Sequence, residues 1–340
     1  MRFTWRPHLR PGVALYVVVC AAALPVGMTI GAVFREIAGP GDRPRVMAVI
    51  DTIPALGGAG AAAAVEPMDP PVLLSAVPPA PPSPASEPAA PEVVGVQPPA
   101  WLANAVPSNP PSGHSLIAIV IDDLGLDRPR TRRAVALKGP MTLAFLPYAE
   151  ELRAQTAEAG QAGHELLLHM PMRPLDEHNN PGPGALTTEL DENGLRERLR
   201  AGLDRVSGYV GINNHMGSRF TSDRRGMEVV MAELKARGLL FLDSRTTPGS
   251  VGLGVARAMG VPHAGRDAFL DNDPSPRAVA DQLAILESRA RQQGTAIAIG
   301  HPHDGTLDAL AAWIETLGER GFTLVPLSTI VRLGQRQEKG

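Results

Sequence analysis

A short run of apolar, mostly β-branched residues at 116–121 ends directly at two adjacent aspartates, Asp122 and Asp123. Runs of this length and composition are typical of buried parallel strands. Unpaired carboxylates are costly to bury, so we expect this pair to face a cation or a reacting group. The carboxyl ends of parallel strands form the active-site rim of α/β folds, and the feature therefore predicts an enzyme with a metal site. The pattern recurs, because later apolar runs end at His169, His215, Asp243, Asp271 and His301.

Short apolar runs and longer amphipathic segments alternate through residues 114–335, which we take as the folded domain. The predicted strands are 116–121, 141–145, 165–168, 209–212, 239–242, 268–270, 296–299 and 323–325. The predicted helices are 149–158, 192–206, 225–236, 276–292 and 307–319, and Ser275-Pro276 has the form of a helix cap and first turn. This alternation predicts an α/β fold, a deformed (β/α) barrel of seven or eight mostly parallel strands.

The N-terminal third predicts a membrane anchor and a spacer. Residues 1–12 carry Arg2, Arg6 and Arg10, and the uncharged stretch 13–34 is long enough to cross a bilayer. A cleavable signal peptide is the alternative, because its start is equally basic. The short basic N-terminus favours a cytoplasmic start, a single pass through the inner membrane, and a catalytic domain in the periplasm.

Residues 35–113 are rich in Ala, Pro, Val and Gly and predict a disordered linker, or less simply a Pro-rich ligand for a partner domain. The net charge of −3 argues against nucleic acid as a partner. Cys20 is the single cysteine, so no disulfide can form within the chain.

The aspartate pair and two histidines could form a metal site. One carboxylate of Asp122 and Asp123 would bind the ion and the other would take a proton from water; the alternative is that both cap the following turn. His169 ends its run, whereas His164 begins it and is expected to be structural. His215 lies in a polar loop and could be a further ligand. Residues beside it that could orient ligands or substrate are Asn213, Asn214, Ser218 and Arg219.

Histidines and aspartates of the later runs supply further candidates. His301 could protonate a leaving amine, and His303 follows it across Pro302. Asp243 could orient a catalytic histidine, or accept hydrogen bonds from its neighbours in the chain. Asp271 and Asp273 precede a predicted helix and are expected to act as caps.

The motifs resemble the polysaccharide deacetylase superfamily, and specifically its divergent branch, over about residues 115–331. The resemblance rests on Ile121-Asp-Asp-Leu-Gly125, Gly163-His-Glu-Leu-Leu-Leu-His169 and Ala298-Ile-Gly-His301. It implies Asp122 as base, Asp123 and His169 as metal ligands, and His301 as the catalytic histidine. In the main superfamily a second metal histidine follows the first by four residues, where this chain has Arg173. The divergent branch takes a histidine from the Asn-Asn-His-Met-Gly-Ser loop instead, which implies His215.

The resemblance implies a deacetylase that uses Zn²⁺ or a similar divalent ion. Its expected substrate is an N-acetylated envelope polysaccharide or a peptidoglycan-like glycan, and O-acetyl esters are chemically close. Two alternatives remain open at this stage. The domain could be catalytically inactive and bind envelope glycan or act as a scaffold, which the missing histidine at Arg173 favours. It could also hydrolyse another bond, such as an amide or a phosphoester.

Overall fold

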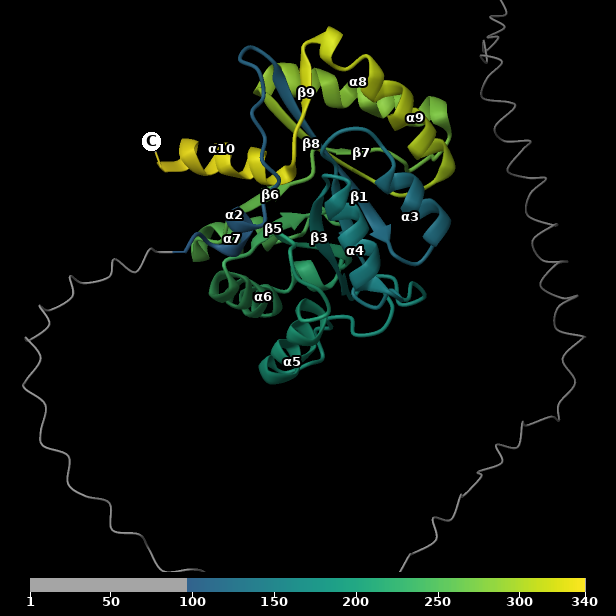
Figure 1. Cartoon of the computed structure of the whole chain (residues 1–340). Coiled ribbons are helices and arrows are strands. Elements are labelled where there is room, and N and C mark those ends of the chain that lie inside the picture. Colours follow the sequence, from purple (N-terminus) through teal and green to yellow (C-terminus); the bar gives the residue numbers. More distant parts are fainter. Residues whose placement is uncertain (1–96, 340) are drawn as a thin grey trace, which may run out of the picture. The chain divides into compact units, whose positions relative to one another are not determined.

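Nine strands form one sheet in residues 97–339, the part of the chain that the computed structural model describes, and every strand pair is parallel. Helices surround the curled sheet (Figure 1). The strands are β1 (Ser115–Leu124), β2 (Thr142–Phe145), β3 (Glu165–Met172), β4 (Gly211–Met216), β5 (Leu240–Asp243), β6 (His263–Gly265), β7 (Ala268–Phe269), β8 (Thr295–Gly300) and β9 (Phe322–Leu324).

β1 lies in the interior of the sheet, whose strand order is β6-β5-β4-β3-β2-β1-β8-β7. β9 and β2 share one edge of β1, because β9 pairs with its first three residues and β2 with residues from Val120 onward. No pairing joins β6 to β7 among the described residues, so the barrel stays open. The predicted deformed barrel is confirmed, with nine strands rather than seven or eight. The extra strand, β6, is only three residues long and has no apolar run to predict it.

Seven of the described helices connect one strand to the next and pack against the sheet or against one another. Aspartates cap three of them, since Asp127, Asp191 and Asp223 accept hydrogen bonds from backbone N–H groups in the first turn. The predicted cap at Ser275 is confirmed as well. These helices are α3 (Arg128–Val135), α4 (Leu152–Gln161), α5 (Glu192–Leu203), α6 (Arg224–Arg237), α7 (Gly252–Met259), α8 (Pro276–Gln293) and α9 (Asp304–Glu315).

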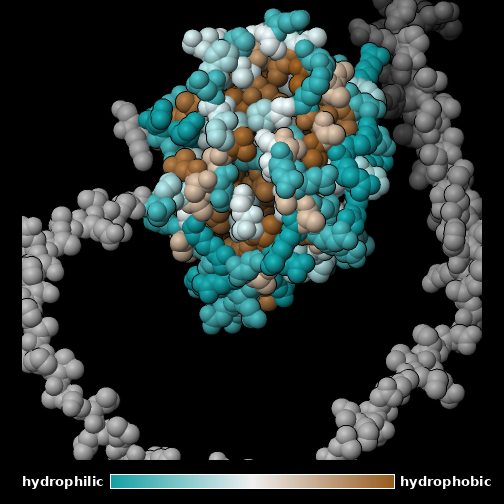
Figure 2. All heavy atoms as spheres, viewed as in Figure 1, coloured by the Kyte–Doolittle hydropathy of each residue, from teal (hydrophilic) through white to brown (hydrophobic). Residues whose placement is uncertain are grey.

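Two apolar layers cover the two faces of β1. Ile117, Ile119 and Ile121 belong to the layer shared with the surrounding helices. The alternate residues of β1 belong to an inner layer that includes Val325 and part of α10 (Leu327–Lys339). Each fully buried aliphatic side chain contributes about 1.5–3 kcal/mol to stability. Figure 2 shows hydrophilic residues over the periphery of one face and hydrophobic residues between them near its middle.

Helices α3, α7 and α10 were not predicted. α3 contains four arginines and buries only Thr131, Ala134 and Val135, so its apolar face is narrow. α7 contains two glycines, which weaken the helical pattern. Helices α3 and α7 form because tertiary packing, rather than local preference, stabilises them.

The folded domain begins earlier than residue 114. Residues 97–113, which the composition had assigned to the linker, include the short helix α2 (Ala100–Ala103). Trp101 is buried there, and its backbone N–H donates to the carbonyl of Gly238. Asn104 donates to the carbonyl of Tyr209. This segment therefore packs as part of the domain.

The predicted anchor at 13–34 and the linker up to residue 96 lie outside the described residues. Within residues 97–339, none of the helices has both the length and the apolar character needed to cross a bilayer.

Candidate metal and catalytic site

The two adjacent aspartates lie inside β1 and not after it. The pairing of β1 with β2 is irregular between Ile121 and Leu124, and Asp123 adopts a left-handed φ of 58°. Successive residues of a regular strand point to opposite faces, and such an irregularity re-aims a side chain. Both carboxylates line the same cleft as a result.

Asp123, His169 and His215 converge from β1, β3 and β4. The Oδ1 atom of Asp123 lies 2.8 Å from Nδ1 of His215 and 3.2 Å from Nε2 of His169. The two imidazole nitrogens are 3.2 Å apart. These three atoms form a compact triangle, as the sequence motifs had implied for a ligand set.

The chemistry of this triangle fits a divalent cation. Asp123 Oδ1 is buried and has no partner in hydrogen-bonding geometry, although two imidazole nitrogens are close to it. Zinc–ligand bonds of about 2.1 Å in a tetrahedron place ligand atoms roughly 3.4 Å apart, close to the observed separations. One carboxylate and two imidazoles leave a coordination position for substrate or water.

Asn213 links the metal site to the second aspartate. Its Oδ1 atom lies 2.9 Å from Nδ1 of His169, and its Nδ2 donates to both carboxylate oxygens of Asp122 at 2.8 and 3.0 Å. Because the amide oxygen only accepts, Nδ1 of His169 carries a proton, which leaves Nε2 as the nitrogen that can bind an ion. One buried amide thus orients a candidate ligand and the candidate base.

Asp122 is 2% exposed and does not belong to the triangle. Burial raises the pKa of Asp122, while the positive charges of His169 and His301 oppose the rise. Burial also acts to raise the pKa of Asp123, but the adjacent imidazoles of His169 and His215 outweigh that effect and hold the pKa well below its usual range. The two neighbouring carboxylates therefore differ, because the pKa of Asp122 is raised and the pKa of Asp123 is lowered.

His301 faces the site from the end of β8, with its Nε2 atom 3.8 Å from Oδ2 of Asp123. Its Nδ1 lies 3.1 Å from Asp271 Oδ1, and its backbone N–H donates to Oδ2 of the same carboxylate at 2.6 Å. Burial acts to lower the pKa of His301, but the bond to Asp271 and the charges of Asp122, Asp123 and Asp271 raise it to about 9. A protonated imidazole is therefore favoured here.

Asp271 is not the helix cap that we expected. Its buried carboxylate accepts from His301 and from the hydroxyl of Thr306, so it holds the imidazole in place. Asp273 does act as a turn residue and accepts from the backbone N–H of Ser275. Asp271, His301 and His303 form a second group whose nitrogen and oxygen atoms lie close enough to bind a cation. Both carboxylate oxygens of Asp271, however, already accept hydrogen bonds.

The remaining predicted residues lie near the site with other contacts. Asn214 lines the cleft and accepts from the backbone N–H of Ser244. Asp243 accepts from the Arg245 N–H and the Ser250 hydroxyl, so it shapes a loop and orients no histidine. The others are His303, Ser218, Arg219 and His164.

His303 is exposed, and its ring lies 5.9 Å from that of His301. Ser218 accepts from the backbone N–H of Leu175, and Arg219 lies on the exposed surface near Glu177. His164 is buried and bonded to main-chain groups at both ring nitrogens, which confirms its structural role.

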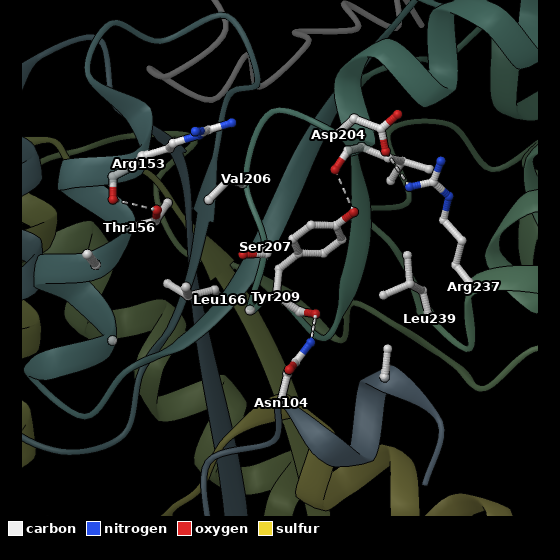
Figure 3. A pocket seen from close by; sticks show the side chains of 15 residues that line it. Asn104, Arg153, Thr156, Leu166, Asp204, Val206, Ser207, Tyr209, Arg237 and Leu239 are labelled. Atoms are coloured by element: carbon white, nitrogen blue, oxygen red, sulfur yellow. Dashed lines mark hydrogen bonds and ion pairs between the residues drawn. The ribbon is translucent and has the colours of Figure 1, made fainter. Parts of the chain in front are cut away.

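A cleft of about 440 Å³ contains the candidate catalytic groups. Sequence reasoning missed three of its lining residues, Arg245, Arg266 and Phe269, because they lie in loops or on a two-residue strand. A larger cavity of about 1020 Å³ lies at the amino-terminal ends of β3, β4 and β5 (Figure 3). In this cavity Asp204 pairs with Arg237, and the hydroxyl of Tyr209 donates to a main-chain carbonyl. The polar groups that line the cavity therefore stabilise the fold.

Comparisons with known proteins agree with this architecture. A family model described as divergent polysaccharide deacetylase matches residues 119–331. The chain is 34% identical over 215 residues to the uncharacterized protein YibQ of Escherichia coli, covering 63% of this chain and 67% of YibQ. It is 35% identical over 205 residues to an uncharacterized protein of Haemophilus influenzae, covering 60% of this chain and 73% of that protein. The crystal structure of the uncharacterized protein ATU2773 from Agrobacterium tumefaciens aligns with a TM-score of 0.66 at 30% identity, covering 68% of this chain and 94% of that one.

Proposed function

Because the chain belongs to the divergent polysaccharide deacetylase family, we propose that it is a metal-dependent hydrolase that removes acetyl groups from an N-acetylated glycan. One observation carries the proposal: a carboxylate and two imidazoles form a compact ligand triangle next to a second, buried carboxylate. His301, held by Asp271, faces the same cleft. Water activation and leaving-group protonation need this set of groups.

The side chains have distinct roles in this proposal. Asp123, His169 and His215 would hold the ion, which when bound lowers the pKa of water and polarises the acyl carbonyl. Asp122 takes the proton from the attacking water, since burial raises its pKa. His301 donates a proton to the leaving nitrogen, and Asp271 keeps its imidazole oriented.

The proposed substrate is a glycan of the cell envelope. We place the domain outside the cytoplasm, tethered by residues 13–34, on the evidence of the basic N-terminus and the uncharged stretch that follows it. Fractionation of cells that express the full chain tests this placement. Recovery from the cytosolic fraction would contradict it.

Acetate release by the full-length protein tests the proposed activity. N-acetylglucosamine oligomers and peptidoglycan are incubated with the protein as purified, after chelator, and after zinc is returned. The proposal predicts release that chelator abolishes and zinc restores, and that His169→Ala removes. His178→Ala is the matched control, because this imidazole is exposed and pairs with Asp176. Release that persists in chelator or in His169→Ala would refute the mechanism.

The alternative of an inactive, glycan-binding module rests on Arg173. Arg173 does not enter the ligand triangle; its side chain lies 3.3 Å from Glu177. In the proposal, His215 from β4 serves as the second histidine ligand in place of a histidine at position 173. The same assay separates the two functions, because the inactive module predicts glycan binding without acetate release.

A further inference from the structure

Two arginines line the cleft beside the candidate catalytic groups, and no part of the proposed reaction uses them. Arg245 follows β5 and is exposed, whereas Arg266 follows β6 and is half-buried. Their guanidinium groups are held by main-chain carbonyls. Arg266 donates from Nε to Ser244 at 2.7 Å and from Nη2 to Arg245 at 3.0 Å, and Arg245 donates back from Nη1 to Arg266 at 3.2 Å.

The backbone is adapted to keep Arg245 in this position. Arg245 has a left-handed φ of 49°, which is uncommon for a residue other than glycine. Its side chain then lies across Gly265, where an added Cβ would be 2.7 Å from Nε and 2.9 Å from Nη2. A side chain at position 265 would therefore displace the guanidinium group.

Neither guanidinium group forms an ion pair with a carboxylate within the part of the chain that the structure describes. Nearby Asp122 and Asp243 attract Arg266 without contacting it, and both carboxylates already have hydrogen-bond partners. Burial first, and the positive charge of Arg245 next, lower the pKa of Arg266. Two neighbouring cations in a partly desolvated cleft repel each other, and a bound anion would offset that repulsion.

From this arrangement we infer that Arg245 and Arg266 bind a carboxylate of the substrate, so that the acetylated glycan is an acidic one. The planar fork of a guanidinium group matches a carboxylate. The inference rests on the proposed function, because the same cleft holds the acetyl group. It places the carboxylate on the acetylated sugar or on its neighbour.

The test uses full-length protein and a muramic acid-containing, N-acetylated disaccharide in two forms, the free carboxylate and its neutral carboxamide. We expect the KM for the carboxylate to be at least about tenfold lower, as for a charge-assisted pair of hydrogen bonds. Arg245→Gln should reduce this preference to less than about twofold. Gly265→Ala should weaken it too, although both arginines remain. Arg224→Gln is the matched control, since Arg224 is exposed and pairs with Glu228 on α6, and it should keep the wild-type preference.

Equal KM values for the two forms in the wild type, or an unchanged preference in Arg245→Gln, would overturn the inference while acetate release still supported a deacetylase. If neither form releases acetate, and N-acetylglucosamine oligomers and peptidoglycan release none either, the proposed function fails, and calorimetric binding of the two disaccharides decides the inference separately. At least about tenfold tighter binding of the carboxylate, lost in Arg245→Gln, would support it. Equal binding would refute it.

Discussion

Replacement of Asn213 by alanine should weaken metal binding without removing a metal ligand. Asn213 is fully buried, and its amide contacts His169 at 2.9 Å and Asp122 at 2.8 and 3.0 Å. In Asn213→Ala the imidazole of His169 loses the acceptor that fixes its tautomer. Loss of such an outer contact costs about 10–100-fold in metal affinity.

The same substitution should destabilise the metal-free protein. Three buried side chains lose a polar partner, those of His169, Asp122 and Ser244, and a buried polar group left without a partner costs about 1–3 kcal/mol. We expect the free energy of unfolding to fall by about 2–4 kcal/mol, because water can enter part of the space that the amide leaves. At saturating zinc the stabilisation by the ion should fall by a further 1.4–2.7 kcal/mol or so, the equivalent of the affinity loss.

Zinc affinity is measured by competition with a chromophoric chelator, and stability by urea unfolding with chelator present. Asn104→Ala is the control, because it removes a half-buried side-chain amide that donates to the Tyr209 carbonyl in the cavity at the amino-terminal end of β4, apart from the cleft that holds the ligands. The control should keep the wild-type Kd. A Kd for Asn213→Ala within about twofold of wild type would refute the role of this amide in orienting His169.

Two further predictions concern the start of the domain and the pH dependence. Trp101→Ala should lower the free energy of unfolding by about 3–5 kcal/mol, whereas Leu102→Ala, at a side chain 37% exposed, should cost much less; equal small effects in urea unfolding would show that the segment does not pack. In chelator-treated protein the pKa of His301 is raised from 6.5 to about 9, so its stabilisation is complete below about pH 6.5 and is lost as the pH rises through about 9. His301→Gln should flatten that part of the curve of melting temperature against pH, and a variant curve parallel to wild type would contradict the assignment.

Most of the strands and the location of the site follow from local patterns. Each apolar run that ends in aspartate or histidine became a strand of one parallel sheet, so Asp123, His169 and His215 meet at its carboxyl edge. The sequence alone predicts that these three residues lie close together, because parallel strands in one sheet have their carboxyl ends at the same edge. The irregularity in β1 that turns both aspartates into the cleft could not be predicted from the sequence pattern.

Contacts between residues distant in sequence were not predictable in the same way. Asp271 resembles a cap by its position before a helix, and only the packing of β7 beside β8 brings it to His301. Arg245 and Arg266 meet because β5 pairs with β6, a strand too short to show a pattern. The start of the domain was missed because a Pro- and Ala-rich composition hides a single buried Trp101.

Crystals of the zinc-saturated protein, with anomalous diffraction measured at the zinc edge, test whether Asp123, His169 and His215 hold the ion. We expect one peak per chain, about 2.0–2.2 Å from a carboxylate oxygen of Asp123, from Nε2 of His169 and from Nδ1 of His215. No peak between these atoms, or a peak bound instead by Asp271, His301 and His303, would contradict it.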